Sequence, residues 1–226
     1  MDEAREEILG RVRRATADVP AEEAPAWDVA HNIDPPAAYE REPMRTPGLI
    51  PDLFADRVAE YRAEVTRVNG EDALAGAIAA VTDRHGARRL AVARGFPAGW
   101  RPEGLELVEE PELSVEQLDA VDGVITACAL AIARTGTIVL DGGPGQGPRR
   151  LTLVPDLHVC VVRAEQIVGT VPEGVQALKG AAEQGRPLTF VSGPSATSDI
   201  ELERVEGVHG PRRLEVVVVD EPVPGA

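Results

Sequence analysis

The sequence predicts an α/β domain with a mostly parallel central sheet, and three observations support this fold class. Short runs of Val, Ile and Leu alternate along the chain with segments of helical periodicity, as expected for strands buried on both faces. The 226 residues suffice for one sizeable core. Only 3% of the residues are aromatic although 43% are hydrophobic, so aliphatic side chains must fill that core.

The first 51 residues are expected to form an extension, and residues 52–226 the α/β domain. Ile8, Leu9 and Val12 follow helical spacing, which predicts a short amphipathic helix over residues 2–19. Repeated prolines from Pro20 to Pro51 then exclude long regular elements. We expect this stretch to be an arm that lies across the domain or across a partner.

Helices and strands are expected to alternate through the domain. Leu74, Ile78 and Val81 give one helix its apolar face, and Ser114 with Gln117 is the capping-box signature of another. The expected helices are 52–63, 71–84, 114–119 and 172–183. The expected strands are 63–68, 89–93, 105–108, 123–127, 137–140, 158–162, 188–191 and 214–219.

The charge balance argues against nucleic acid as a partner. The formal net charge is −15, which disfavours contact with phosphate backbones or anionic lipid. No run approaches the roughly 18 apolar residues needed to span a bilayer, and the N-terminus lacks a signal-peptide pattern. The expected location is therefore the cytoplasm.

Two cysteines, Cys128 and Cys160, lie far apart in apolar runs without metal-ligand spacing. They are expected to be reduced and buried. The chain has no cysteine cluster of the ferredoxin type, so it is expected to bind no iron–sulfur cluster by itself. The histidines show no metal spacing with nearby carboxylates, and no metal site is expected.

Two glycine-containing loops of the C-terminal half are candidate binding segments, expected at the carboxyl ends of strands, where ligands of parallel sheets usually bind. The first is Thr135-Gly136-Thr137, which offers two hydroxyls around a flexible backbone position, although turn formation alone would explain it. In the second, Arg150 beside Arg149 could clamp a carboxylate or phosphate. The alternative is a surface hairpin with solvated arginines.

A third segment carries the strongest signal, and it comprises residues 192–201 and 207–211. Ser198 and Glu201 match a capping box, so a helix is expected to begin near Asp199 and to offer an anion site, although capping alone would explain both residues. The candidate acid/base groups are Asp199, Glu201 and His209. The candidate ligand-binding residues are Ser192, Gly193, Ser195, Thr197 and Gly210.

Four motifs together resemble the LutC family, also called YkgG-like or LUD-domain proteins. They cover most of residues 120–219 and read TGTIVL (135–140), RLTLVPDLHVCVV (150–162), SGPSATSDIE (192–201) and GVHGPRRL (207–214). The resemblance implies a three-layer α/β/α sandwich similar to the sugar-phosphate isomerase and CoA-transferase (NagB/RpiA) fold. The family usually carries an acidic residue before the Thr-Gly-Thr element, where this chain has Arg134.

The resemblance also implies a role in oxidising L-lactate to pyruvate, as a non-redox subunit beside two iron–sulfur proteins. Iron–sulfur clusters would then belong to the partner subunits, and this chain would bind no cofactor. One alternative is a small-molecule enzyme or binding protein of the same fold, acting on a phosphorylated, CoA-linked or carboxylate ligand. Another is a scaffold whose proline-rich arm mediates assembly.

Overall fold

The computed structural model describes residues 2–15, 17, 47–110, 113–198, 204–207 and 209–220. The chain divides into two compact units, residues 1–40 and 41–226. In the first unit, the helix expected over residues 2–19 is observed as α1 (Asp2–Ala15), with Ile8 and Val12 exposed. Most of the proline-rich stretch, residues 18–46, lies outside the described residues.

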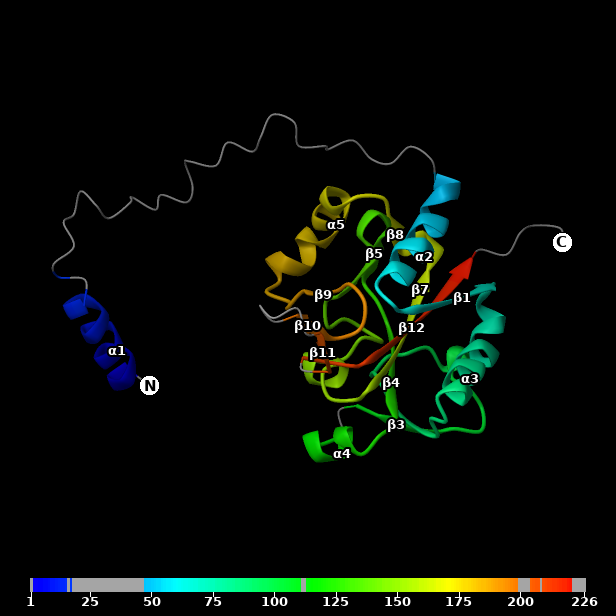
Figure 1. The fold of residues 1–226 in the computed structure, drawn as a ribbon, viewed down its shortest axis with the longest axis horizontal. Helices are drawn as coiled ribbons and strands as arrows, with labels where there is room; N and C mark the ends of the chain where they lie inside the picture. Colours follow the sequence, from blue (N-terminus) through cyan, green and yellow to red (C-terminus); the bar gives the residue numbers. More distant parts are fainter. Residues whose placement is uncertain are drawn as a thin grey trace. The chain divides into compact units, whose positions relative to one another are not determined.

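The second unit is built on a six-stranded parallel sheet, as the sequence predicts (Figure 1). Its strands, in spatial order, are β1 (Glu64–Asn69), β12 (Arg213–Asp220), β7 (Leu157–Arg163), β4 (Gly123–Ala127), β2 (Arg89–Val92) and β3 (Glu106–Glu109). Every neighbouring pair in this sheet is parallel. The neighbouring interior strands β7 and β12 are buried over almost their whole length, because helices and a second sheet cover both faces.

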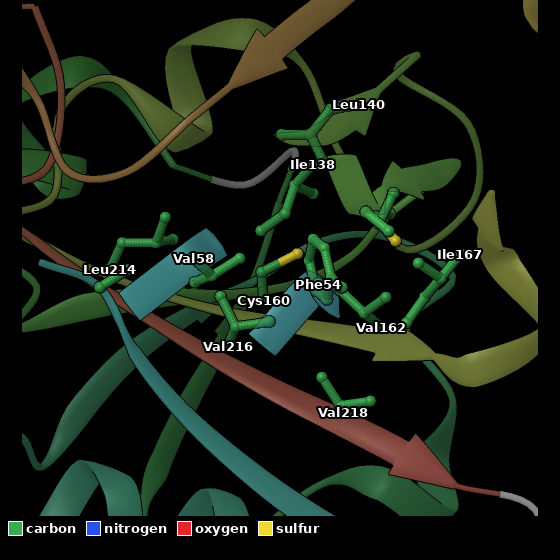
Figure 2. Packing of buried hydrophobic residues seen from close by; sticks show 14 residues of the cluster. Phe54, Val58, Ile138, Leu140, Cys160, Val162, Ile167, Leu214, Val216 and Val218 are labelled. Carbon is green, nitrogen blue, oxygen red and sulfur yellow. The ribbon is translucent and has the colours of Figure 1, made fainter. Parts of the chain in front are cut away.

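Two helices pack on opposite faces of this sheet. Helix α3 (Leu74–Arg84) contributes Leu74, Ile78 and Val81 to one face. Helix α2 (Ile50–Glu60) contributes Phe54 and Val58 to the other face, against alternate side chains of β7 and β12 (Figure 2). This arrangement gives the layers of an α/β sandwich, in agreement with the predicted fold class.

A smaller four-stranded sheet shares the α2 face. Its strands, in spatial order, are β8 (Ile167–Val168), β5 (Leu130–Ile132), β6 (Thr137–Leu140) and β9 (Thr189–Val191). Helix α5 (Val171–Glu183) covers its other side, where Leu178 packs with Leu130 and Val139. Strands β6 and β9 were expected in the parallel sheet, but β6 pairs antiparallel with both β5 and β9. Strand β6 cannot be parallel to β5 because only four residues join them, and a parallel crossover needs many more.

Local geometry explains where two of the helices begin or end. The expected capping box of α4 (Val115–Asp119) is present: the backbone N–H of Gln117 donates to Ser114 Oγ at 3.3 Å, and that of Ser114 to Gln117 Oε1 at 2.8 Å. Helix α2 ends earlier than the predicted residue 63, because Arg62 adopts a left-handed conformation with φ 65°.

The expected helix near Asp199 was predicted from Ser198. In the structure Ser198 is the last residue of β10 (Ala196–Ser198), which pairs in antiparallel register with β11 (Arg204–Glu206). The helix itself would begin in residues that the structure does not describe, so it stays a prediction. Residues 199–203, which include Asp199 and Glu201, lie outside the described residues.

Candidate functional site

A pocket of about 240 Å³ lies where the central parallel strands begin. His158 and Leu214, paired in register, are each the second residue of their strands, β7 and β12, and both line it. The remaining lining comes from residues 190–195, residues 209–211 and the 3₁₀ turn η5 (Arg149–Thr152). We call this the amino-end pocket. The expected position at carboxyl strand ends is wrong for residues 207–211, which lead into β12, whereas residues 192–195 do follow a strand, β9 of the smaller sheet.

Ser195 joins the two loops that form one wall of this pocket. Its backbone N–H donates to the carbonyl of Pro211 at 2.8 Å, and its carbonyl accepts from the N–H of Gly207 at 3.0 Å. Its hydroxyl oxygen also accepts from the backbone N–H of His209 at 3.0 Å. Two backbone hydrogen bonds and one to the Ser195 hydroxyl therefore hold the two loops together.

The Thr-Gly-Thr element adjoins the pocket through a chain of hydroxyls. Thr135 Oγ1 lies 2.7 Å from Thr137 Oγ1, which in turn lies 2.8 Å from Ser192 Oγ. Gly136, at φ 55°, has a structural role: a Cβ there would lie 2.7 Å from the carbonyl carbon of Arg57 in α2. Its lack of a side chain therefore allows α2 to pack closely on this loop.

The two neighbouring arginines of the second loop point to different partners. Arg149 lines the amino-end pocket and donates from Nη1 to Thr152 Oγ1 at 3.1 Å. Partial burial lowers the pKa of Arg149, and no carboxylate of the described chain lies within ion-pair distance of it. Arg150 instead pairs with Glu110 at 2.6 Å and is not among the lining residues. The candidate anion-binding arginine of this pocket is thus Arg149.

His158 is the buried polar group at the inner side of the pocket. It is 2% exposed, and its Nε2 lies 2.8 Å from Thr126 Oγ1 on the neighbouring strand β4. The thiol of Cys160 follows on the same face of β7. The pKa of Cys160 is lowered, mainly by a hydrogen bond with Cys128 and to a smaller extent by contacts with His158 and Thr126. These contacts outweigh the opposite effect of burial.

Both cysteines are free and buried, as the sequence predicts. The sequence analysis did not select His158 as a site residue, although it ends the second candidate segment, which begins at Arg149. The available signal was a histidine within the otherwise apolar strand run LHVCVV. In the described part of the chain, no group of three or more His, Cys, Asp or Glu residues is arranged to hold a metal ion.

Apart from Arg150, which pairs with Glu110 outside this pocket, the candidate residues from the sequence fall into three groups. Those that line the pocket are Ser192, Gly193, Ser195, His209 and Gly210. Those of the Thr-Gly-Thr element, Thr135 to Thr137, reach it through Ser192. Thr197 lies in β10, and Asp199 and Glu201 lie outside the described residues. The roles assigned to all of them remain predictions.

Comparisons with known proteins agree with the fold and with the motifs. A family model described as the LUD domain matches residues 99–219. The chain is 48% identical to a lactate utilization protein C of Deinococcus radiodurans, over 96% of both chains. It is 33% identical to the protein of that name from an Exiguobacterium species, over 60% of this chain and 62% of the relative.

A solved structure supports the same assignment. The crystal structure of a DUF162 family protein from Deinococcus radiodurans is similar with a TM-score of 0.68 and 45% identity, covering 77% of this chain and 98% of that one. Among the described helices, none is long and apolar enough to cross a membrane. The LUD match spans more than half of the 226 residues, and the first relative matches nearly the full length. The chain therefore belongs to the LUD domain family.

Proposed function

We propose that this chain acts in lactate utilization, as a non-redox subunit of a cytoplasmic system that oxidises L-lactate to pyruvate together with iron–sulfur partner proteins. The observation that carries the proposal is the full-length similarity, at 48% identity, to a lactate utilization protein C. The electron-transferring clusters belong to the partners in this proposal, and this chain supplies a binding site for a small carboxylate.

The size and chemistry of the amino-end pocket suit a small anionic ligand. Its volume of about 240 Å³ is below the roughly 300–1,000 Å³ of pockets for drug-sized ligands. The Arg149 guanidinium, without a carboxylate partner in the described residues, suits bidentate binding of a carboxylate. The Ser192 hydroxyl offers a hydrogen bond, and the exposed His209 imidazole can accept one from a 2-hydroxyl group.

Growth on L-lactate as the sole carbon source tests the proposed role. A strain that lacks the gene should fail to grow, and the wild-type gene should restore growth. Arg149→Gln should restore it poorly, because the carboxylate loses its charged partner, whereas Arg88→Gln should restore it fully because Arg88 pairs with exposed Asp83 outside the pocket. Unimpaired growth of the deletion strain would contradict the proposal.

The partner proteins require a separate experiment. Affinity purification of the tagged chain from cells grown on L-lactate should recover proteins that contain iron–sulfur clusters, identified by their visible absorption and by mass spectrometry. A chain lacking residues 1–51 tests whether the N-terminal extension mediates this assembly. Recovery of the full chain alone, under conditions that support growth, would contradict the subunit role.

The alternative function is a small-molecule enzyme of the same fold. The observation that favours it is the buried His158, which contacts Thr126 and Cys160 directly behind the pocket, since polar groups placed in this way often serve chemistry. Crystals soaked with L-lactate, CoA or sugar phosphates test this alternative. Density for a ligand beside Arg149 and His158, together with turnover by the isolated chain, would favour the enzyme over the subunit.

A further inference from the structure

A second cavity, of about 640 Å³, lies where neighbouring parallel strands end, and the proposed function does not use it. Arg94 and Glu110 line it, and they follow β2 and β3 within two residues. The last residues of these strands, Val92 and Glu109, are paired in register. Carboxyl ends of parallel strands are the usual place for ligands in open α/β sheets. We call this cavity the carboxyl-end pocket.

A glycine-rich loop, residues 142–147, forms one wall of the carboxyl-end pocket. The carbonyl of Gly145 accepts from the backbone N–H of Ala127 at 2.7 Å, and the N–H of Gly145 donates to the carbonyl of Arg94 at 2.8 Å. The loop is therefore fixed across the ends of β2 and β4. Gly142 and Gly147 both have φ 68° and line the cavity, so main chain without side chains faces the space.

Two buried carboxylates fix the other walls. Glu110 and Asp141 are each 7% exposed and line the cavity. Glu110 pairs with Arg150 at 2.6 Å, and Asp141 pairs with Arg186 at 2.7 Å. Oδ1 of Asp141 also accepts from the backbone N–H of Gly143 at 2.9 Å, which ties the loop to the pair. Both negative charges are thus already balanced by arginines before any ligand binds.

Arg94 adds a positive charge that these pairs do not balance. Its side chain is exposed, it lines the cavity, and among the described residues no carboxylate lies within ion-pair distance of it. Within the same described set, Oε1 of Glu110 accepts from Arg150, whereas Oε2 accepts no hydrogen bond. The cavity therefore offers one anion-binding group and one hydrogen-bond acceptor.

We propose that the carboxyl-end pocket binds a small hydroxylated organic anion. Arg94 holds the carboxylate or phosphate group, which its planar guanidinium can bind in bidentate fashion. Glu110 accepts a hydrogen bond from a hydroxyl of the same molecule. A bound ligand shields this acceptor from water, and an acceptor shielded without a donor is costly, so the contact selects against anions that lack the hydroxyl. Prolines 144, 148 and 187 line the same cavity and can contact the carbon skeleton.

Glycine amides give a direct readout of this proposal, since their ¹H–¹⁵N signals are well separated in NMR spectra. Titration with glycerol 3-phosphate should shift the amide signals of Gly142, Gly143 and Gly147. Glycerate tests a carboxylate in place of the phosphate, and n-propyl phosphate tests an anion of similar size without hydroxyls. We expect n-propyl phosphate to bind at least about tenfold more weakly than glycerol 3-phosphate.

Variants separate this site from the amino-end pocket. Arg94→Gln should weaken binding of the preferred ligand by at least about tenfold, whereas Arg94→Lys should weaken it less. Arg88→Gln, outside both pockets, and Arg149→Gln, in the amino-end pocket, should leave the affinity unchanged. Unchanged thermal midpoints would show that every variant is folded.

Three results would overturn the proposal. The glycine signals could stay unshifted with glycerol 3-phosphate and with glycerate, Arg94→Gln could bind as tightly as the wild type, or the shifts could be confined to residues 192–195 and 209–211. The last result would place the anion in the amino-end pocket. None of these outcomes depends on growth on L-lactate, so this inference and the proposed function can fail separately.

Discussion

Different interactions stabilise the walls of the two pockets. At the amino-end pocket, backbone packs against helix α2: a Cβ added at Gly136 or Gly193 would lie 2.7 Å or 2.6 Å from an atom of Arg57 or Tyr61. At the carboxyl-end pocket, ion pairs of buried carboxylates hold the walls. The amino-end pocket should therefore be sensitive to substitutions that add side-chain atoms at these glycines. The carboxyl-end pocket should be sensitive to substitutions that remove a charge from an ion pair.

A single short turn contributes to both pockets. In η5, Arg149 lines the amino-end pocket, whereas Arg150 pairs with Glu110 of the carboxyl-end pocket. Leu151, which follows Arg150 in this turn, is fully buried. It packs in the hydrophobic cluster that contains Leu118 and Val124. The two arginines are thus adjacent in sequence but face different sites, and the buried Leu151 that follows them anchors the turn.

The largest predicted effect tests the packing against α2. Gly136→Ala should lower the free energy of unfolding by about 2–4 kcal/mol, because alanine is strained at positive φ and its Cβ meets helix backbone that cannot move aside. Chemical denaturation measures the change. Gly180→Ala is the matched control: no atom lies within 4 Å of its Cβ in α5, and it should stabilise the protein by roughly 0.5–1 kcal/mol. Equal effects at the two glycines would refute the close packing.

The next effect tests the ion pairs of the carboxyl-end pocket. Arg186→Gln should cost about 1–2 kcal/mol of unfolding free energy, because Asp141 is left as a buried charge without its partner. The estimate is reduced for the solvent exposure of Arg186, whose side chain is 37% exposed. Urea unfolding measures the loss.

Arg88→Gln provides the control for this prediction. It removes a pair with Asp83 in which both side chains are 67% exposed, and it should change the unfolding free energy by less than about 0.5 kcal/mol. Amide hydrogen exchange should also become faster in residues 142–147 of Arg186→Gln but not in Arg88→Gln. An effect of Arg186→Gln no larger than that of the control would show that the pair does not hold this wall.

The parallel sheet could be predicted from sequence because its central strands are long. The runs LHVCVV of β7 and LEVVVV of β12 are apolar over several residues, as strands covered on both faces must be. The smaller sheet could not be predicted in the same way. Strands β5 and β8 have only three and two residues, which is too short for any periodicity. Their pairing follows from tertiary contacts.

The candidate site was foreseen in part. The Gly- and Ser-containing segments around Ser195 and His209 do converge on one pocket, and their composition pointed to them. Their place at the amino ends of β7 and β12 depends on strand order, which local patterns do not contain. The sequence also does not show that Arg150, and not Arg149, forms an ion pair. Its partner is Glu110, which is 40 residues away in sequence.

A smaller effect concerns the amino ends of the neighbouring strands β2 and β4, where Asp122 precedes β4. Asp122 Oδ2 accepts from the backbone N–H of Arg88 at 2.7 Å and of Arg89 at 2.8 Å, and these hydrogen bonds lower the pKa of its carboxyl. The stabilisation is therefore present above the pKa of the unfolded state, about 3.9, and is lost as the pH falls through the lower pKa of the folded state.

Asp122→Asn tests this linkage. It should cost under about 1 kcal/mol of unfolding free energy near pH 6, since the carboxylate is largely exposed, and the difference from wild type should shrink as the pH falls below about 4. Urea unfolding at a series of pH values measures it. A difference that grows on acidification would show that the hydrogen bonds favour the protonated form instead.

The smallest effect on stability is predicted at His209, and it completes the contrast between the two pockets. The side chain of His209 is exposed, and its backbone N–H, not its ring, holds Ser195 Oγ. His209→Ala keeps this backbone hydrogen bond, so the free energy of unfolding should change by less than about 0.5 kcal/mol and the thermal midpoint by only a few degrees. Under the proposed function, the same variant should support growth on L-lactate less well than the wild type. A large loss of stability would show that the imidazole is a structural group of the loop, and its removal could then no longer be interpreted as the loss of a ligand contact.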